Sequence, residues 1–418
     1  MKFAHLADTH LGYRQFGLVE REKDFYEVFE KVIDKIIEEK VDFVIHSGDL
    51  FESARPSPIA LLTFQKGLLK LKGAGIPMYA IAGNHDIVMR NDSIPPQVIF
   101  KKLGLKVISP INTTYMHGDI FIAGLPFYPS SQVKNLKSKL ADLSKKAANH
   151  EKSILVLHQG IDKYFKMNYE LEIGDLPDNF NYYAMGHIHN YINDNFGKGK
   201  LVYPGSGEIW KVNELKDYRE HGKGFVLVDM EGQKPLVKRV KVDIPREFIK
   251  RSLDYKELER GIAGIKETIK DFDKKPILDL EINNVESDIK RVYELINEGL
   301  GDLSLMIRPT FNMLDEDIDV VLSEDKEGVG PKEIIGDQLK EYGDDIVSLA
   351  NDLYDFLSRD KHDESRELVD QFFEEYYKTP AEQIESEIED IETNAEEFID
   401  EEETPKEDVQ VKSKEVLE

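Results

Sequence analysis

The segment KFAHLADTH, residues 2–10, leads an apolar run typical of a buried strand directly into Asp8 and His10. Four later segments repeat this arrangement, in which an apolar run ends on polar residues that bind metals well. They are DFVIHS before Gly48-Asp49, MYAIA before Gly83-Asn84-His85-Asp86, SILVL before His158-Gln159-Gly160, and YYAM before Gly186-His187-Ile188-His189. Because ligands of layered α/β proteins gather beyond the carboxyl ends of strands, we expect these five loops to converge on one site.

Short apolar runs alternate with helical patterns throughout the first 235 residues. The runs predict strands at 2–7, 43–46, 78–82, 120–123, 154–157, 182–185 and 225–228. Amphipathic helices fit between them, for example at 22–39 and 58–71. This alternation predicts a layered α/β domain.

The polar residues after the strands combine carboxylates, an amide and imidazoles, and the chain contains no cysteine. Such hard oxygen and nitrogen donors suit Mn²⁺, iron or Zn²⁺, and fit Mg²⁺ less well because the histidines are so many. An aspartate with two free oxygens can bridge two ions. Two ions roughly 3.5–4 Å apart can activate water and clamp a phosphoryl group.

The competing interpretation is that each histidine simply packs in the core or lies on the surface. We assign that ordinary role to His5, His46, His117, His150, His221 and His362. A lone Gly-Asp pair carries almost no information. All five motifs in this order, each at the end of a predicted strand, favour a shared metal site over coincidence.

The composition limits the possible classes of protein. The absence of cysteine excludes disulfides, thiolate zinc sites and a cysteine nucleophile. No apolar run reaches the roughly 18 residues that a membrane span needs, and the first residues lack the features of a signal peptide. We therefore expect a soluble, cytoplasmic protein.

The net charge of -26 argues against a nucleic-acid partner at first sight. It is unevenly distributed: residues 1–240 sum to about +3, residues 241–320 to about -6, and residues 321–418 to about -23. A nearly neutral first half can still present a local basic face to phosphate groups. The charge therefore weakens the case for a nucleic-acid partner without excluding one.

Five segments are expected along the chain. Residues 1–235 form the layered domain, and 236–314 form a small domain with a β-α-β-α-β pattern. Its expected elements are strands at 248–253, 277–282 and 303–308 and helices at 256–270 and 286–297. An acidic linker, 315–330, precedes helical stripes at 331–379, and the acidic tail 380–418 has a composition typical of disorder.

The motif set D-x-H, G-D, G-N-H-D, H and G-H-x-H resembles the signature of the calcineurin-like metallophosphoesterase superfamily. More narrowly, the chain resembles the SbcD/Mre-eleven family of double-strand-break repair nucleases, and its archaeal members above all. The residues that carry this likeness are MKFAHLADTHLGYRQF at 1–16, GDLFESARPSP at 48–58, AGNHD at 82–86, LHQG at 157–160, YYAMGHIH at 182–189 and VYPGS at 202–206. The resemblance implies a layered β-sandwich flanked by helices, a small α+β capping domain and C-terminal helices.

The resemblance also implies the role of each motif residue. One ion would be held by Asp8, His10, His189 and the bridging Asp49, and the other by Asp49, Asn84, His158 and His187. The implied cofactor is two Mn²⁺ per subunit, with Mg²⁺ or another divalent ion as alternatives. His85 would be the catalytic residue, contacting the scissile phosphate and helping the leaving oxygen depart. Asp86 would either orient the His85 ring or cap the turn.

One position departs from the family pattern. Many members carry a histidine directly after Gly-Asp-Leu-Phe, where it is associated with exonuclease action, whereas this chain has Glu52. We therefore do not transfer that role. Four residues that follow metal motifs are candidates for contact with the DNA backbone: Arg14, Arg55, Arg90 and Asn91. Ordinary surface charge is the alternative explanation for them.

The resemblance implies that the chain processes DNA ends as a 3′–5′ exonuclease on double strands and an endonuclease on single strands. Its implied partners are DNA ends, an SMC-like ATPase of the Rad-fifty/SbcC type bound through the C-terminal helices, and a second copy of the chain. Helix 58–71 is more apolar than one core-facing stripe requires, so it is either unusually buried or meets a partner. The resemblance implies the second, with dimerisation through this helix. The alternatives are a phosphatase or phosphodiesterase for small substrates and a non-catalytic scaffold for DNA ends.

Overall fold

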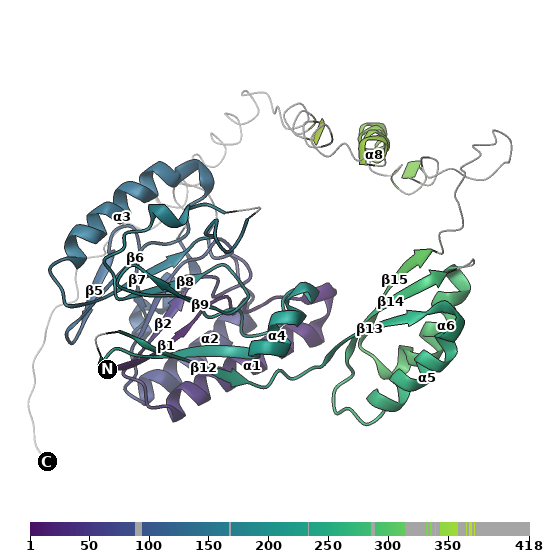
Figure 1. Ribbon diagram of the computed structural model, residues 1–418, viewed down its shortest axis with the longest axis horizontal. Coiled ribbons are helices and arrows are strands. Elements are labelled where there is room, and N and C mark those ends of the chain that lie inside the picture. The colour runs from purple at the N-terminus through teal and green to yellow at the C-terminus, as the bar shows by residue number, and fades with distance from the viewer. Residues whose placement is uncertain are drawn as a thin grey trace, which may run out of the picture. The chain divides into compact units, whose positions relative to one another are not determined.

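The computed structural model describes residues 1–87, 94–166, 169–232, 234–285, 289–313 and 343–357, with shorter pieces at 332, 335–336, 339, 365, 368–369 and 372. The chain divides into two compact units, Met1–Glu316 and Asp317–Glu418. Within the first unit lie two six-stranded sheets and one three-stranded sheet (Figure 1).

The first sheet has the strand order β12-β11-β1-β2-β3-β4. Its strands are β1 (Lys2–Leu6), β2 (Phe43–Ser47), β3 (Met78–Ile81), β4 (Lys106–Val107), β11 (Lys223–Asp229) and β12 (Leu236–Val242). Strands β1 to β4 are parallel, whereas β11 and β12 are antiparallel to their neighbours. Because β12 belongs to this sheet, the layered domain extends beyond residue 235, where the sequence pattern placed its end.

The second sheet has the strand order β5-β6-β7-β8-β10-β9. Its strands are β5 (Thr114–His117), β6 (Ile120–Gly124), β7 (Lys152–His158), β8 (Tyr182–Gly186), β9 (Ile192–Phe196) and β10 (Gly199–Tyr203). Strands β6, β7, β8 and β10 are parallel to one another. All seven runs that predicted strands in the sequence correspond to strands of the two sheets.

The two sheets face each other across a shared apolar core. Alternate residues of β1 point to opposite sides, so that Phe3 packs between the sheets while Ala4 and Leu6 face the helices. Phe3 stacks on Phe43 of β2, with 4.8 Å between ring centroids, and meets Tyr182 of β8 edge-on. Aromatic side chains from both sheets therefore pack together in the core between the two layers.

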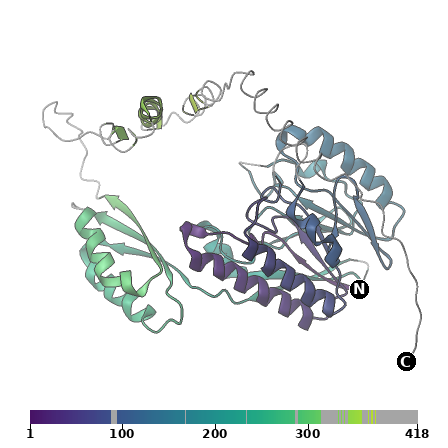
Figure 2. The ribbon, with the colours of Figure 1, turned by 180° about the vertical axis from the view of Figure 1, so that it is seen from behind.

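Helices cover the outer faces of the two sheets. On the first sheet lie α1 (Val19–Glu38) and α2 (Pro58–Gly73), which run side by side in the view from behind (Figure 2). On the second sheet lies α3 (Val133–Ala147). A short helix, α4 (Leu215–His221), precedes β11. The layered α/β expectation is confirmed.

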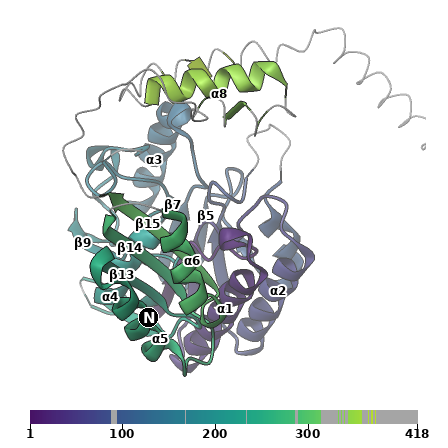
Figure 3. The same ribbon diagram turned by 90° about the vertical axis from the view of Figure 1, so that its right-hand side faces the viewer.

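The third sheet belongs to the small β-α-β-α-β region. It consists of β13 (Phe248–Asp254), β14 (Ile277–Val285) and β15 (Met306–Met313), all parallel, with α5 (Leu258–Ile269) and α6 (Ile289–Leu300) on one face (Figure 3). The last strand begins three residues later than predicted, because Gly301–Leu303 forms a 3-10 turn. The predicted order of elements is present.

A buried group of charges joins this region to α1. Arg246 donates to Asp24 at 2.7 Å, and Arg21 donates to the same carboxylate at 2.8 Å. The Arg21 guanidinium also lies 4.8 Å from the ring centroid of Phe248, the first residue of β13. Because these charges are paired where water is excluded, they fix the start of the small domain against the layered domain.

In the second unit, the structure describes one helix longer than a turn, α8 (Asp344–Leu357). It falls inside the helical stripe predicted at 331–358. The linker 315–330 and the tail 380–418 lie outside the described residues. No helix in the described part of the chain is both long and apolar enough to cross a membrane.

Candidate metal centre

Five loops meet beyond the carboxyl ends of β1, β2, β3, β7 and β8, as the sequence predicts. They bring the predicted ligands together in two clusters, Asp8 with His10 and His189, and Asp49 with His158 and His187, and a third group of possible ligands, His10 with Glu52 and His85, overlaps the first. Within each cluster the ligand atoms lie within 4.8 Å of one another. Asn84 lies beside the second cluster, with its Oδ1 3.0 Å from His187 Nδ1 and 3.1 Å from His158 Nε2.

Asp49 lies between the two clusters. Its Oδ2 is 3.1 Å from His158 Nε2 and 3.8 Å from His10 Nε2, while its Oδ1 accepts the backbone N–H of His85. The side chain is 2% exposed. This position between both histidine sets is the one that a bridging ligand requires.

Two of the histidines, His10 and His189, use Nδ1 as an outward donor, so that Nε2 faces the centre. His10 donates through Nδ1 to Glu52, and His189 donates through Nδ1 to Glu214. Their Nε2 atoms then face each other at 3.1 Å. Two imidazole lone pairs this close repel each other unless a cation or a proton lies between them. The donor set therefore fits divalent metal ions.

The electrostatics of the cavity also favour a cation. Burial disfavours the charged form of His158, yet the carboxylates of Asp49 and Asp8 raise the pKa of this ring to about 9. Burial would raise the pKa of Asp49, but the surrounding histidines hold it well below its usual range. A site that stabilises a proton in this way also stabilises a metal ion, which would displace that proton.

Local backbone geometry shows why the motifs contain their particular residues. Asp8, His10, Asp49 and His187 all have positive φ, a conformation that residues other than glycine rarely adopt. At Gly83, a Cβ would lie 2.1 Å from Asp49 Oδ1, so the loop can approach the bridging carboxylate only with glycine there. The strained backbone aims these side chains at the centre.

His85 lies at the edge of the clusters. Its Nδ1 donates to the backbone carbonyl of Glu52 at 3.0 Å, which leaves Nε2 free, and the side chain is 27% exposed. Asp86 does not touch this ring. Its carboxylate accepts three backbone N–H groups, from Leu50, Phe51 and Gly83. Of the two roles considered for Asp86, the structure therefore gives it the turn cap.

The other histidines described have the ordinary roles expected of them. Burial lowers the pKa of both His5 and His46 to about 3, so both rings are neutral in the core. His117 lies beside Tyr79, His150 stacks on Phe121, and His221 pairs with Asp217. His362 lies outside the described residues.

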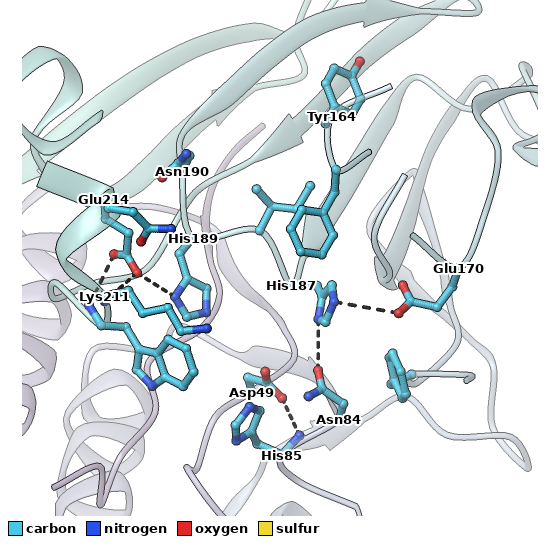
Figure 4. A pocket seen from close by; sticks show the side chains of 15 residues that line it. Asp49, Asn84, His85, Tyr164, Glu170, His187, His189, Asn190, Lys211 and Glu214 are labelled. Carbon is cyan, nitrogen blue, oxygen red and sulfur yellow. Dashed lines mark hydrogen bonds and ion pairs between the residues drawn. The ribbon is translucent and has the colours of Figure 1, made fainter. Parts of the chain in front are cut away.

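Three residues that surround the histidines carry no motif signal. Glu52 and Glu214 are hydrogen-bonded to His10 and His189, and Trp210 packs over the His10 ring with 5.4 Å between centroids. The sequence marks Glu52 only as a departure from the family pattern and Trp210 only as the single tryptophan of the chain, and it offers no sign of Glu214. Figure 4 shows Glu214 directed at His189, and Glu170 beside His187 on the opposite side of the pocket.

The candidate DNA contacts are only partly described. Arg14 is exposed and pairs with Glu22 at 2.5 Å, and Arg55 is exposed. Arg90 and Asn91 lie outside the described residues. Neither described arginine lines the pocket that contains the metal clusters.

Sequence comparisons agree with the fold. Residues 1–191 match the model of the calcineurin-like phosphoesterase family. The layered sheets, the converging loops and this match define the protein as a calcineurin-like metallophosphoesterase, a class whose members use divalent metal ions.

Curated relatives define the family more narrowly. The DNA double-strand break repair protein Mre11 of Methanocaldococcus jannaschii is 38% identical over 383 residues, which cover 91% of this chain and 99% of the relative. Mre11 of Methanococcus maripaludis is 36% identical over 332 residues, 76% of this chain and 86% of the relative. Mre11 of Sulfolobus acidocaldarius is 36% identical, covering 72% and 80%. The chain therefore belongs to the Mre11 family, the one that its motifs resemble.

Proposed function

We propose that this chain is a two-metal DNA nuclease that processes DNA ends during double-strand-break repair. The observation that carries the proposal is the pair of histidine–carboxylate clusters on either side of Asp49, in a chain of the Mre11 family. The proposed activities are 3′–5′ exonuclease on double strands and endonuclease on single strands, with Mn²⁺ as the ion.

Each predicted site residue has a role in this proposal. Asp8, His10 and His189 hold one ion and Asn84, His158 and His187 the other, with Asp49 shared. Two ions bound there would activate water and neutralise charge on the phosphoryl oxygens. His85 remains outside both ligand sets. Its Nδ1 is fixed by the Glu52 carbonyl, so its free Nε2 is available to contact the scissile phosphate and to hold a proton for the leaving oxygen.

The test is incubation of the purified chain with Mn²⁺ and a linear duplex, beside an Asp49→Ala variant and a small phosphomonoester. If the unaltered chain degrades the duplex and the Asp49→Ala variant does not, the result supports the proposed nuclease activity. Hydrolysis of the ester alone would reject it in favour of a small-substrate phosphatase. Binding of DNA ends without hydrolysis of either substrate would indicate a scaffold. Replacing Mn²⁺ with Mg²⁺ tests the choice of ion.

Arg14 and Arg55 are proposed to contact the DNA backbone from the loops that follow the first two metal motifs. Removing both charges should weaken DNA binding by a similar factor for all sequences. It should also reduce the slope of log affinity against log salt by about 0.9 per lost contact. Fluorescence anisotropy over a salt series measures both quantities. An unchanged slope would assign these residues to ordinary surface charge.

The chain is proposed to form a homodimer through α2. Besides its buried stripe, this helix exposes Ile59, Leu62 and Leu69, at 59%, 55% and 43% of their surface. Their spacing places them on one face of the helix. Such an exposed apolar face is typical of an interface, and a second copy supplies the same face by symmetry.

Leu62→Glu is expected to convert the dimer to a monomer, because it places a charge in the centre of this face. Light scattering after size-exclusion chromatography measures the mass. Lys146→Glu, on the exposed face of α3, is the control and should leave the mass unchanged. A dimeric Leu62→Glu variant would exclude α2 as the interface.

The small region from β13 to β15, residues 248–313, is proposed to act as the DNA-recognition cap. Residues 331–379 are proposed to bind an ATPase of the Rad-fifty/SbcC type. Within the second segment, α8 has an amphipathic pattern in which Ile346, Leu349, Leu353 and Phe356 recur at helical spacing. The ATPase contact is tested by co-elution on size-exclusion chromatography. The full chain should co-elute with such an ATPase, and a chain that ends at residue 330 should not. Co-elution of the truncated chain would place the contact elsewhere.

A further inference from the structure

The histidines of the two metal clusters differ in what holds the ring nitrogen that faces away from the metal. In the first cluster, His10 Nδ1 donates to Glu52 Oε2 at 2.7 Å, and His189 Nδ1 donates to Glu214 Oε1 at 3.0 Å. Both imidazoles are therefore backed by a carboxylate. A carboxylate in this position fixes the tautomer and makes the metal-facing nitrogen a stronger donor.

Both carboxylates are themselves held in place. The indole N–H of Trp210 donates to Glu52 Oε2 at 3.3 Å, and the Trp210 ring stacks against His10. Glu214 is 4% exposed and accepts from the buried ammonium of Lys223 at 2.5 Å. The rings of the first cluster are thus oriented by rigid partners.

The second cluster lacks such support. His158 Nδ1 donates to a neutral acceptor, the backbone carbonyl of Ser47, at 2.8 Å. The carboxylate nearest to the outer nitrogen of His187 belongs to Glu170, at 3.9 Å, which is too long for a hydrogen bond (Figure 4). Asn84 contributes a neutral oxygen where the first cluster has the charged Asp8.

We propose that the two metal positions have unequal affinity, so that the position of Asp8, His10 and His189 fills first and holds its ion more tightly. Glu52 and Glu214 are positioning residues that create this difference. The inference rests on the proposed two-metal function and adds to it an order of loading. Glu52, where the sequence departs from the family pattern, thus positions the His10 ring from its outer nitrogen.

The charges around each position support the same order. The proposed ligand set of the first position contains two aspartates, Asp8 and Asp49, whereas that of the second contains Asp49 and the neutral Asn84, although Asp8 Oδ1 also lies 4.0 Å from His158 Nε2. A divalent ion in a partly buried site gains more from two negative ligands than from one. The ligands themselves and the residues behind them therefore both favour the first position.

The test is a titration of the metal-free, full-length chain with Mn²⁺. Electron paramagnetic resonance counts the free ion, and the fluorescence of Trp210, the single tryptophan, reports on the first position. The Trp210 ring contacts His10 and His189, with centroids 5.4 and 5.0 Å away. We expect two affinities that differ by about tenfold or more, with most of the fluorescence change at the first equivalent.

Two matched variants then test whether Glu52 causes the difference between the two affinities. Glu52→Gln keeps the shape and removes the charge, and should weaken the tighter site by about 10–100-fold while leaving the weaker site within about twofold. Glu170→Gln removes the carboxylate on the opposite side of the pocket and should leave the tighter site unchanged.

Three results would overturn the inference: two equal affinities in the unaltered chain, a fluorescence change confined to the second equivalent, or equal effects of the two variants. The first two need no variant, so an unfolded Glu52→Gln protein would not prevent the decision. A folded chain that binds no Mn²⁺ would instead reject the proposed function itself.

Discussion

Replacing Asp49 with alanine is expected to abolish DNA cleavage, with a loss of at least about 1,000-fold, because this single side chain serves both metal positions. Its Oδ2 lies 3.1 Å from His158 Nε2 and 3.8 Å from His10 Nε2. Removing the carboxylate leaves the imidazoles of both clusters without their shared negative partner. The variant should therefore bind fewer than two ions as well as lose activity.

Single-turnover cleavage of a linear duplex, with Mn²⁺ binding measured on the same preparation, checks this result. Asp49→Asn keeps the shape and separates the loss of charge from any loss of fold. Asp194→Asn removes a carboxylate that pairs with Lys163 outside the two ligand clusters, and it should remain active. An Asp49→Ala protein that retained a tenth of the activity, or that still bound two ions, would show that Asp49 is not the bridge.

The strands of the core are predictable from the sequence because they are buried on both faces. The runs FVIHS of β2 and SILVL in β7 contain almost no exposed residue, so their apolar composition identifies them without an alternating pattern. Strand β12 is different. Of its seven residues only Val240 is buried, and it is a strand because it pairs with β11 along all seven. Pairing with a neighbouring strand leaves little trace in local composition.

The residues that face the metals are predictable for a related reason. Each of them lies at or just after the end of a strand, and Asp8, Asp49 and His187 also adopt positive φ. These constraints produce short motifs around Asp8, Asp49, Asn84, His158 and His187. The residues behind them obey no such rule. Glu214 reaches His189 from a loop 25 positions further along the chain, and nothing in its neighbourhood indicates that contact. Such partners depend on the folded geometry alone.

Glu52 illustrates both the value and the limit of a family pattern. The sequence identifies it as a departure, and repulsion of DNA phosphate is the consequence that its charge suggests. The structure places the carboxylate against His10 Nδ1, at 2.7 Å, and within 3.6 Å of His85 Nδ1. Its carboxylate is thus hydrogen-bonded to His10 and lies beside His85, so that it has partners within the protein.

Replacing His85 with alanine should separate metal binding from cleavage. The ring belongs to neither of the two ligand clusters that share Asp49, and its Nδ1 donates a hydrogen bond to the backbone carbonyl of Glu52. Both ions should therefore bind as in the unaltered chain. Cleavage should fall by about 100- to 10,000-fold, the usual contribution of a positioned proton donor or acceptor.

The decisive measurement compares two substrates on one preparation of His85→Ala. If His85 assists departure of the leaving oxygen, a DNA phosphodiester with a good leaving group, such as a nitrophenyl ester, should be cleaved with a much smaller loss than ordinary DNA, because that leaving group needs no proton. Equal losses on both substrates would restrict His85 to binding the phosphate. Loss of metal would instead make it part of the ligand set and would overturn the division of roles. His85→Gln, which keeps a polar group near the same position, should recover phosphate binding but not proton transfer.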